Sequence, residues 1–384
     1  MHHHSDIEVP ARVRRKVGRV LAAIVVPLAL LTAIALVALW PRGESPVGSI
    51  PLNSPGVQMV SGPITSVGQT DAQGQTPVEM EVEGVPVPVH VPAEVVASGL
   101  EVGDVIEARF NPAMVASGTA HIFVDFERGM PLALLAGLYV LVIVAVARWK
   151  GLAALAGLGV SLLVVGFFII PALAGGGNAF AVVLTGASAM MFASIYLAHG
   201  ISIRTTTAII GTFLGLLITT AVAVWAVGAQ NLSGTGGEQT AMLSWSLGGI
   251  NMRTLLLAGI ILAGLGALND VTITQVSTIW ELHAESPSTP RRRLISRGMA
   301  IGRDHIASTV YTLAFAYVGA SLPLLILASI YQRSFLDLMQ VEQIAEEITR
   351  TLAASVGLVL AIPLTTAVAA LLAPVAPGRD RVSA

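Results

Sequence analysis

Residues 253–281 read RTLLLAGIILAGLGALNDVTITQVSTIWE, a run long enough to cross a lipid bilayer as one helix. The first half is apolar, and the second half adds Asn, Asp, Thr, Gln and Ser side chains. Spacings of three or four residues predict one shared helical face for Gly259, Ala263, Gly266, Asp270, Thr274, Ser277 and Glu281. Small residues on such a face let a neighbouring helix approach closely in lipid.

Asp270 is the ionisable group within the membrane part of that face. At 1.5 Å per residue it lies roughly 25 Å along the axis from Arg253, against a hydrocarbon core of about 30 Å. Either the helix end reaches water at Asp270, or Asp270 forms an ion or substrate site, because a carboxylate in a span must face protein or a water-filled cavity. The neighbouring Asn, Thr and Gln side chains favour a site.

The composition is that of a membrane protein with several spans. Hydrophobic residues make up 54% of the 384 residues and charged residues 11%, whereas soluble chains carry about 25% charged residues. There is no cysteine, which excludes disulfides, thiolate catalysis and cysteine-ligated metals. The net charge of -2 comes with no basic aromatic stripe, so we expect no nucleic-acid partner.

Residues 1–40 predict a basic N-terminus and an uncleaved anchor helix. The apolar run at 20–40 is longer than a signal-peptide core, and no Ala-x-Ala site follows it. Because basic residues precede this run, we expect the N-terminus in the cytoplasm. These basic residues are Arg12, Arg14, Arg15, Lys16 and Arg19. We interpret His2, His3 and His4 as a tag remnant or a chance run.

Residues 41–128 predict a small antiparallel β-barrel similar to an OB fold, outside the cytoplasm. Pro86 and Pro88 indicate an edge strand. The barrel lacks the aromatic and basic lining of nucleic-acid-binding OB folds, so we interpret it as a spacer or docking module or as a ligand sensor. Short strands are expected at residues 78–82, 85–91, 100–110 and 121–126.

Residues 129–375 predict a membrane core of seven helices, which makes eight transmembrane helices with the anchor. A polar loop at 230–239 leads to a short interfacial helix at 244–249. Residues 376–384 form a cytoplasmic tail. A loop follows the sixth span and contains Arg291, Arg292, Arg293 and Arg297, and Arg303 opens the seventh span. The seven spans are expected at residues 131–147, 152–173, 179–198, 205–227, 253–281, 305–331 and 352–372.

The distribution of charge predicts the orientation of these spans. With the N-terminus in the cytoplasm, alternation leaves the barrel, Glu238 and the acidic segment 337–347 outside. It places the loops richest in Lys and Arg inside, including Arg148, Lys150, Arg204, Arg291, Arg303, Arg379 and Arg381. Both termini are therefore expected in the cytoplasm.

The crossing of the sixth and seventh helices is the expected binding site. Asp304 is either a helix cap or a functional carboxylate, and Arg303 beside it would set the charge state of Asp270 or Asp304. The predicted substrate- or ion-binding residues are Asn269, Asp270, Thr274, Gln275, Arg303, Asp304 and Ser308.

Other charged residues near the helix ends have ordinary interpretations beside a functional one. His199 is an interfacial end residue or a proton relay. Arg253 is an interface anchor or a gate contact to Glu346 or Glu347, and these two are first-turn carboxylates of the eighth span.

The sequence carries no enzyme motif. It has no Walker A, His-Glu-x-x-His or Gly-x-Ser-x-Gly pattern and no His cluster with metal spacing, so we expect neither an enzyme nor a cofactor or metal site. An intramembrane hydrolase with Asp270 and Asp304 as its dyad is the enzymatic alternative. Transport by this chain would be secondary, channel-like or powered by a partner.

Several motifs resemble the YibE/F family of bacterial membrane proteins. They are GALNDV at 266–271, GRD at 302–304, YVGASLP at 317–323, and AEEI at 345–348 with GLVLAIP at 357–363. The resemblance covers about residues 130–375 and implies a multi-pass membrane protein and transporter. Where relatives have Met before the Asp, this chain has Asn269, which makes the expected site more polar.

These observations predict a secondary, proton- or cation-coupled transporter of a small solute in a bacterial inner membrane. The alternative is a non-transporting scaffold or sensor whose barrel, residues 41–128, docks an envelope partner. The expected partners are the lipid bilayer, a small solute or ion, and a second copy of the chain.

Overall fold

The structure, a computed structural model, describes residues 11–43, 47–49, 51, 54–117, 119–247, 249–330 and 334–373. His2 to His4 and the predicted tail at 376–384 lie outside these residues. The chain divides into two compact units, Gly48–Val146 and the combination of Met1–Val47 with Ala147–Ala384.

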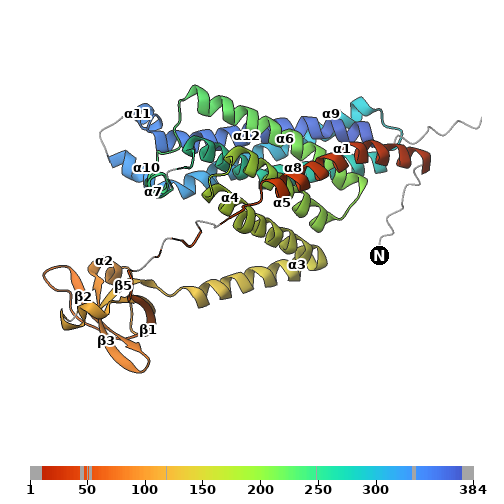
Figure 1. The fold of residues 1–384 in the computed structure, drawn as a ribbon. Helices are drawn as coiled ribbons and strands as arrows, with labels where there is room; N and C mark the ends of the chain where they lie inside the picture. Colours follow the sequence, from red (N-terminus) through yellow and green to blue (C-terminus); the bar gives the residue numbers. More distant parts are fainter. Residues whose placement is uncertain are drawn as a thin grey trace, which may run out of the picture. The chain divides into compact units, whose positions relative to one another are not determined.

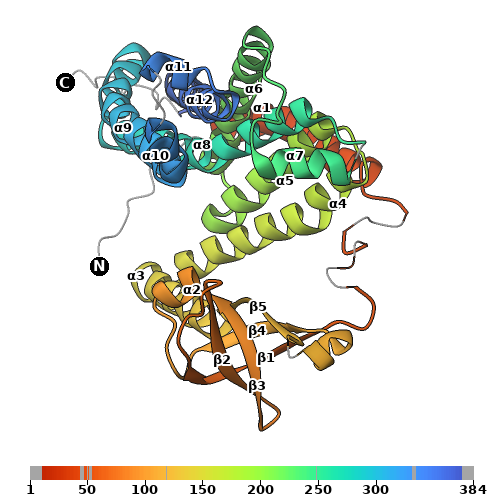
Figure 2. The ribbon, with the colours of Figure 1, turned by 90° about the vertical axis from the view of Figure 1, so that its left-hand side faces the viewer.

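The smaller unit contains a closed five-stranded barrel in the order β1-β2-β3-β5-β4 (Figure 2). Alternate side chains of the strands fill its interior, among them Ile64, Val78, Met80, Val89 and Ile106, which confirms the expected small barrel. Its elements are β1 (Gln58–Val67), β2 (Gln75–Val82), β3 (Val85–Pro92), α2 (Ala93–Ala97), β4 (Val105–Phe110), the 3-10 helix η1 (Pro112–Ser117) and β5 (His121–Phe126).

Two of the three prolines of β3, Pro86 and Pro88, lie in the half of the strand that has one neighbour. β3 pairs with β2 along its whole length but with β5 at Val89 and His90 alone. Since proline has no N–H to donate, Pro86 and Pro88 fit this half of the strand, and the predicted edge character is confirmed there.

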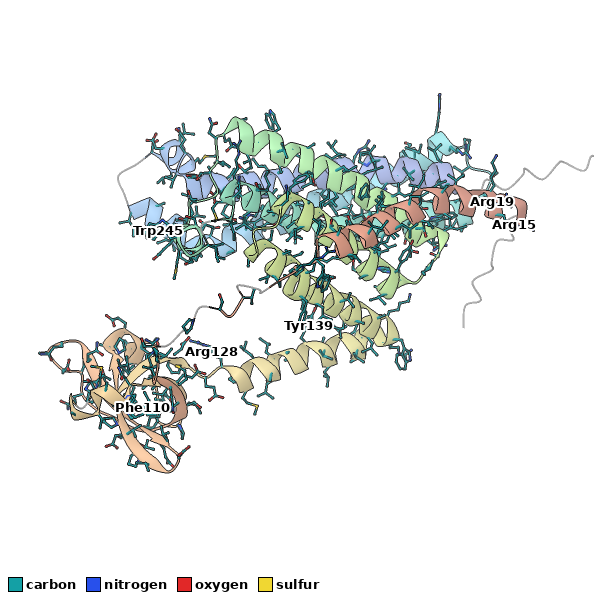
Figure 3. All side chains as sticks on the ribbon, viewed as in Figure 1. Arg15, Arg19, Phe110, Arg128, Tyr139 and Trp245 are labelled. Carbon is teal, nitrogen blue, oxygen red and sulfur yellow. The ribbon has the colours of Figure 1, made fainter. Side chains whose placement is uncertain are left out.

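The larger unit is a bundle of long helices that run side by side (Figure 1). Figure 3 shows Arg15 and Arg19 at one end of this bundle and Trp245 at the other. Its helices are α1 (Ala11–Ala38), the later part of α3 (Gly129–Val164), the π-helix η2 (Val165–Ile169), α4 (Ile170–Ala174), α5 (Ala179–His199), α6 (Ile203–Ala229), α7 (Glu238–Ser246), α8 (Met252–Glu285), α9 (Arg291–Ala320), α10 (Leu322–Ile330), α11 (Phe335–Met339) and α12 (Glu342–Leu372).

Helices α6, α8 and α12 form the centre of the bundle through small residues. A Cβ on Gly357 of α12 would lie 1.8 Å from Thr219 Oγ1 of α6. A Cβ on Gly211 of α6 would lie 2.3 Å from Thr365 Oγ1 of α12. Glycine therefore permits this close approach, as is usual where helices pack in lipid.

Three predicted boundaries are wrong. The arginines from Arg291 onward belong to α9 and not to a loop, because Leu294, Gly298 and Gly302 bury one face of that helix while the arginines stay exposed. Helix α12 begins at Glu342, ten residues before the predicted start, because Ile344, Ala345 and other residues of its first turns are buried. The short helix expected at 244–249 is α7, Glu238–Ser246, and Gly248 lies outside the described residues.

The number of spans depends on two breaks. Among the described helices, six are long and apolar enough to cross a membrane, or seven if the α9–α10 pair, bent by 62°, is one span. One of the six is a 46-residue run, Gly129–Ala174, which contains both the second and the third predicted spans. Arg148 breaks this run with a non-helical φ of 53° and ψ of -134°. Eight spans remain a prediction.

Candidate functional site

The loop between α6 and α7 is bound to the start of α12. Ser233 donates from its backbone N and its hydroxyl to Glu342 Oε1, at 2.6 and 2.5 Å, and Gly236 N donates to Glu346 Oε1 at 3.3 Å. One turn before the loop, Gln230 Nε2 donates to Thr349 Oγ1 at 2.9 Å. These bonds hold the loop over one face of α12.

Glycines allow the loop to lie this close to its neighbours. Gly234 has a φ of +81°, and a Cβ there would lie 2.3 Å from the backbone O of Met252 at the start of α8. A Cβ on Gly236 would lie 2.7 Å from the backbone N of Gln343. A side chain at either position would push the loop away from α8 or α12.

Glu346 and Arg350 lie one turn apart under this loop, within α12. Glu346 is 6% exposed, so it is buried although it is ionisable. Arg350 has 28% of its side chain exposed, and its Nη2 lies 3.5 Å from Glu347 Oε1. Among the ion pairs of the described residues, none includes Glu346.

A cavity of about 250 Å³ adjoins these two side chains. Thr240 of α7 adds a hydroxyl, and Gly259 of α8 leaves space beside Arg350, whose Nη2 would lie 3.9 Å from a Cβ there. The rest of the wall is mainly apolar and comes from α4, α5 and α8: Leu173, Val183, Leu255, Leu256, Ala258 and Leu262. A mostly apolar cavity with a few converging polar groups is the usual form of a small-molecule site.

A second cavity of about 180 Å³ lies against another face of α12, where the α9–α10 pair bends. Tyr317 and Ser321 line it from the bend, and Glu347 and Thr351 from α12, together with apolar residues. The Glu347–Arg350 pair therefore joins the residues that line the two cavities. α7, α10 and α11 lie at this end of the bundle (Figure 1).

The structure separates the seven residues predicted as one site into three groups. Asn269 Nδ2 donates to Ser194 Oγ of α5 at 2.9 Å. Asp270 is exposed, and its charge, like that of Lys150, acts on His199 at the end of α5. These two residues of α8 therefore belong to its side near α5.

Gln275 belongs to the second group and is 1% exposed. Its Nε2 donates to the backbone O of Gly298 in α9 at 2.9 Å and to Thr366 Oγ1 in α12 at 2.7 Å. Gln275 thus links three helices at the predicted crossing, where Gly302 leaves room for its side chain. Thr274, the residue before Gln275, is half-buried.

Arg303, Asp304 and Ser308 form the third group on the exposed surface of α9. In the part of the chain that the structure describes, neither Arg303 nor Asp304 forms an ion pair, and Asp270 forms none either. The expected pairing of Arg303 with a carboxylate is therefore absent from these residues. A ligand role for the seven residues remains a prediction.

Among the described residues, Arg253 forms no ion pair with either of the carboxylates proposed as its gate partners. Its Nη2 donates to the backbone O of Val227 at 3.4 Å, near the C-terminal end of α6. Such a contact is the usual use of an arginine near free helical carbonyl groups, and it fits the interpretation of Arg253 as an anchor.

From the sequence, Glu346 is interpreted as a first-turn carboxylate or as a gate contact of Arg253, and Arg350 is not singled out. Both follow the start of α12 at Glu342, so Glu346 lies beyond the first turn and is not a cap. The signal that could have marked them is the i, i+4 spacing of an acidic and a basic residue that precede the apolar part of α12. Thr272, one of the polar residues of the stretch 253–281, was not assigned to the predicted site, and its buried Oγ1 lies 2.6 Å from Thr212 Oγ1 of α6.

The cavity residues do not provide a site for a multivalent metal. Across the described ranges, no group of three or more His, Asp or Glu side chains could hold a metal ion. The polar groups of the Glu346 cavity are suited instead to a small solute with hydrogen-bonding or charged groups.

The long apolar helices, several of them able to cross a membrane by length and composition, and the small barrel are the features of a helical membrane protein with a separate β-domain. Residues 135–375 match the YibE/F-like protein family, so the chain belongs to the YibE/F family, as its motifs predicted. Searches of the curated proteins and of the solved structures each found no match.

Proposed function

We propose that this protein is a secondary transporter of a small solute and that the solute binds in the Glu346 cavity. The observation that carries the proposal is a buried carboxylate, 6% exposed, on the wall of a cavity of about 250 Å³ inside a helical bundle. Ionisable residues within membrane spans are costly and commonly mark substrate or ion pathways. The bend between α9 and α10 supports the proposal, since broken helices often border transporter sites.

The proposed location is a bacterial cytoplasmic membrane, with both termini inside and residues 41–128 outside. The basic end of α1, marked by Arg15 and Arg19, lies opposite Trp245, and this supports the orientation because Lys and Arg favour the cytoplasmic side (Figure 3). Dividing the 46-residue run at Arg148 gives the eight spans.

Glu346 is the proposed coupling carboxylate in place of Asp270. Glu346 is buried beside a cavity, whereas Asp270 is exposed on α8. A carboxylate shielded from water changes its charge state readily when a cation or proton arrives. Asp270 remains a second candidate because its charge acts on His199.

Uptake into liposomes tests the proposal. The full chain would be reconstituted, and uptake of labelled amino acids, amines, sugars and carboxylates would be measured with and without an imposed proton or sodium gradient. We expect uptake of at least one solute to depend on the gradient, to be lost in Glu346→Gln, and to persist in Glu238→Gln, which changes an exposed carboxylate of α7. Loss in Asp270→Asn with retention in Glu346→Gln would return the coupling role to Asp270.

A scaffold or sensor is the second candidate, because the barrel has its own core and forms a separate compact unit. Deleting residues 45–126 separates the two functions. If the protein is a transporter, the variant without the barrel keeps solute uptake. If it is a scaffold, the full chain shows no uptake, and the variant no longer captures an envelope protein.

A further inference from the structure

Two groups of opposite charge line the Glu346 cavity and form no ion pair with each other. Glu346 and Arg350 stand at positions i and i+4 of α12, a spacing at which a carboxylate and a guanidinium readily pair. Here Arg350 Nη2 lies 3.5 Å from Glu347 Oε1 instead, and the described residues provide no ion pair for Glu346. The cavity wall therefore presents an acceptor and a donor group side by side.

The helix start does not account for Glu346. Glu342 begins α12 and is the residue that accepts both hydrogen bonds from Ser233 of the loop. Glu346 lies in the second turn, where the helix dipole has little effect. Its bond from Gly236 N is a long one to a neutral donor, at 3.3 Å. Because a buried carboxylate is costly unless it is paired, an occupant that brings positive charge would stabilise Glu346.

The charges around the cavity select a molecule with both signs. A simple cation would meet the Arg350 guanidinium, and a simple anion would meet Glu346 with Glu347 close behind it. An ammonium group directed to Glu346 and a carboxylate directed to Arg350 would satisfy both. A guanidinium has five N–H donors and binds a carboxylate with two parallel hydrogen bonds.

The remaining wall fits a short hydrocarbon group. Leu255, Leu256 and Leu262 of α8 face the cavity together with Leu173 and Val183. A volume of about 250 Å³ is far larger than a single water needs, at about 30 Å³ of liquid volume. We propose that the cavity binds a small zwitterionic amino acid with a short apolar side chain, an inference that rests on the proposed function only for the choice of this cavity as the solute site.

Three probes of matched shape test this inference. Valine carries both charges, isobutylamine is valine without its carboxylate, and 3-methylbutanoate is valine without its ammonium group. The melting temperature of the purified full chain would be titrated with each. We expect valine to raise it, with an apparent affinity at least tenfold higher than that of either analogue. An analogue that equals valine would overturn the inference in favour of a site for one charge, and no shift with any of the three would overturn it as well.

Variants assign each charge of the probe to its partner. Glu346→Gln should weaken the binding of valine but not that of 3-methylbutanoate. Arg350→Gln should weaken the binding of valine but not that of isobutylamine, and Glu238→Gln should change the binding of none of the three probes. If Glu346→Gln does not fold, Glu346→Asp keeps the charge on a shorter side chain and should weaken valine less than tenfold. Equal loss of all three probes in both cavity variants would contradict the assignment.

Binding and transport fail separately in this design, because the titration needs no membrane and no gradient. Valine binding without uptake into liposomes would keep the inference and overturn the proposed transport. Gradient-driven uptake of another solute without any valine shift would keep transport and overturn the inference.

Discussion

Arg350 Nη2 lies 3.5 Å from Glu347 Oε1, so the guanidinium is drawn toward the neighbouring carboxylate on α12 and Glu346 remains without an ion pair among the described residues. Both side chains of the pair are about one-third exposed or less, at 28% and 31%. The Arg350–Glu347 pair therefore leaves the Glu346 carboxylate available to a solute, as the proposed site requires.

Glu347→Gln should weaken solute binding although Glu347 does not line the Glu346 cavity. Neutralising Glu347 frees the guanidinium to pair with Glu346 at the favourable i, i+4 spacing, and that pair would compete with the solute. We expect about tenfold weaker valine binding, which is about 1.4 kcal/mol. Titration of the melting temperature measures it, with Glu238→Gln as control, and unchanged or tighter binding would remove Glu347 from the account.

Gln275→Leu should destabilise the bundle. Gln275 is buried and supplies hydrogen bonds to Gly298 O and Thr366 Oγ1, and both acceptors would lose this donor. Leaving buried polar groups unmatched costs about 1–3 kcal/mol. The melting temperature in detergent should fall, whereas Ser308→Ala on the exposed face of α9 should change stability by no more than about 0.5 kcal/mol. A Leu variant as stable as the wild type would show that the link is not needed for packing.

Gly357→Ala and Gly266→Ala should have opposite effects. A Cβ on Gly357 would lie 1.8 Å from Thr219 Oγ1, so α6 and α12 would have to move apart, at a cost of about 1–3 kcal/mol. A Cβ on Gly266 would have no atom within 4 Å among its described surroundings, and alanine favours the helix by about 0.5–1 kcal/mol. Melting temperatures that move in the same direction would refute the close packing of α6 and α12.

His121 should make the barrel less stable in mild acid. Its ring stacks on Phe110 with centroids 4.9 Å apart, and burial lowers the pKa of its imidazole below the ordinary 6.5. The unfolded chain then binds a proton more readily than the folded barrel does. Stability is therefore fully present above pH 6.5 and declines as the pH falls through 6.5 toward the lowered pKa.

Hydrogen exchange of the β4 and β5 amides in the full chain measures this effect, expressed as protection factors corrected for the intrinsic rate. Protection should fall between pH 7.5 and pH 5.5, the range about one unit either side of the ordinary histidine pKa. His121→Phe keeps an aromatic ring against Phe110 and should remove that dependence. Equal pH dependence in wild type and variant would exclude His121 as its source.

Hydrophobic runs predicted most of the helices because lipid-facing side chains are apolar whatever they pack against. The barrel followed from period-two alternation and turn residues, and its core residues Val78, Met80 and Val89 alternate as expected. The start of α12 was missed because its charged residues lower the local hydropathy. Of these, Glu342 accepts a hydrogen bond from the loop, and Glu346, Glu347 and Arg350 line cavities.

The sequence predicts which residues share a face of α8 with Asp270, but it does not predict which helix packs against that face. Periodicity places Asp270 and Gln275 near each other along the helix, and both were assigned to the crossing with α9. In the structure Gln275 reaches α9, whereas Asn269 reaches Ser194 of α5 and Asp270 is exposed. Which helices pack together depends on long-range shape, such as Gly357 against Thr219, and spacing within one helix does not encode it.

The most direct test of the account asks whether water reaches the Glu346 cavity and whether a bound solute blocks access to it. Because the chain has no cysteine, a single introduced thiol reports its own surroundings. Leu255→Cys places it on the cavity wall, and Val224→Cys places it on α6 at a side chain that is 48% exposed but does not line the cavity. The rate of modification by a membrane-impermeant maleimide would be measured for both. The account predicts fast modification of Leu255→Cys that valine slows in an otherwise wild-type chain but not with Glu346→Gln, and slow modification of Val224→Cys. A Leu255→Cys thiol as unreactive as Val224→Cys, or one that valine and every solute taken up by the liposomes leave unprotected, would contradict it.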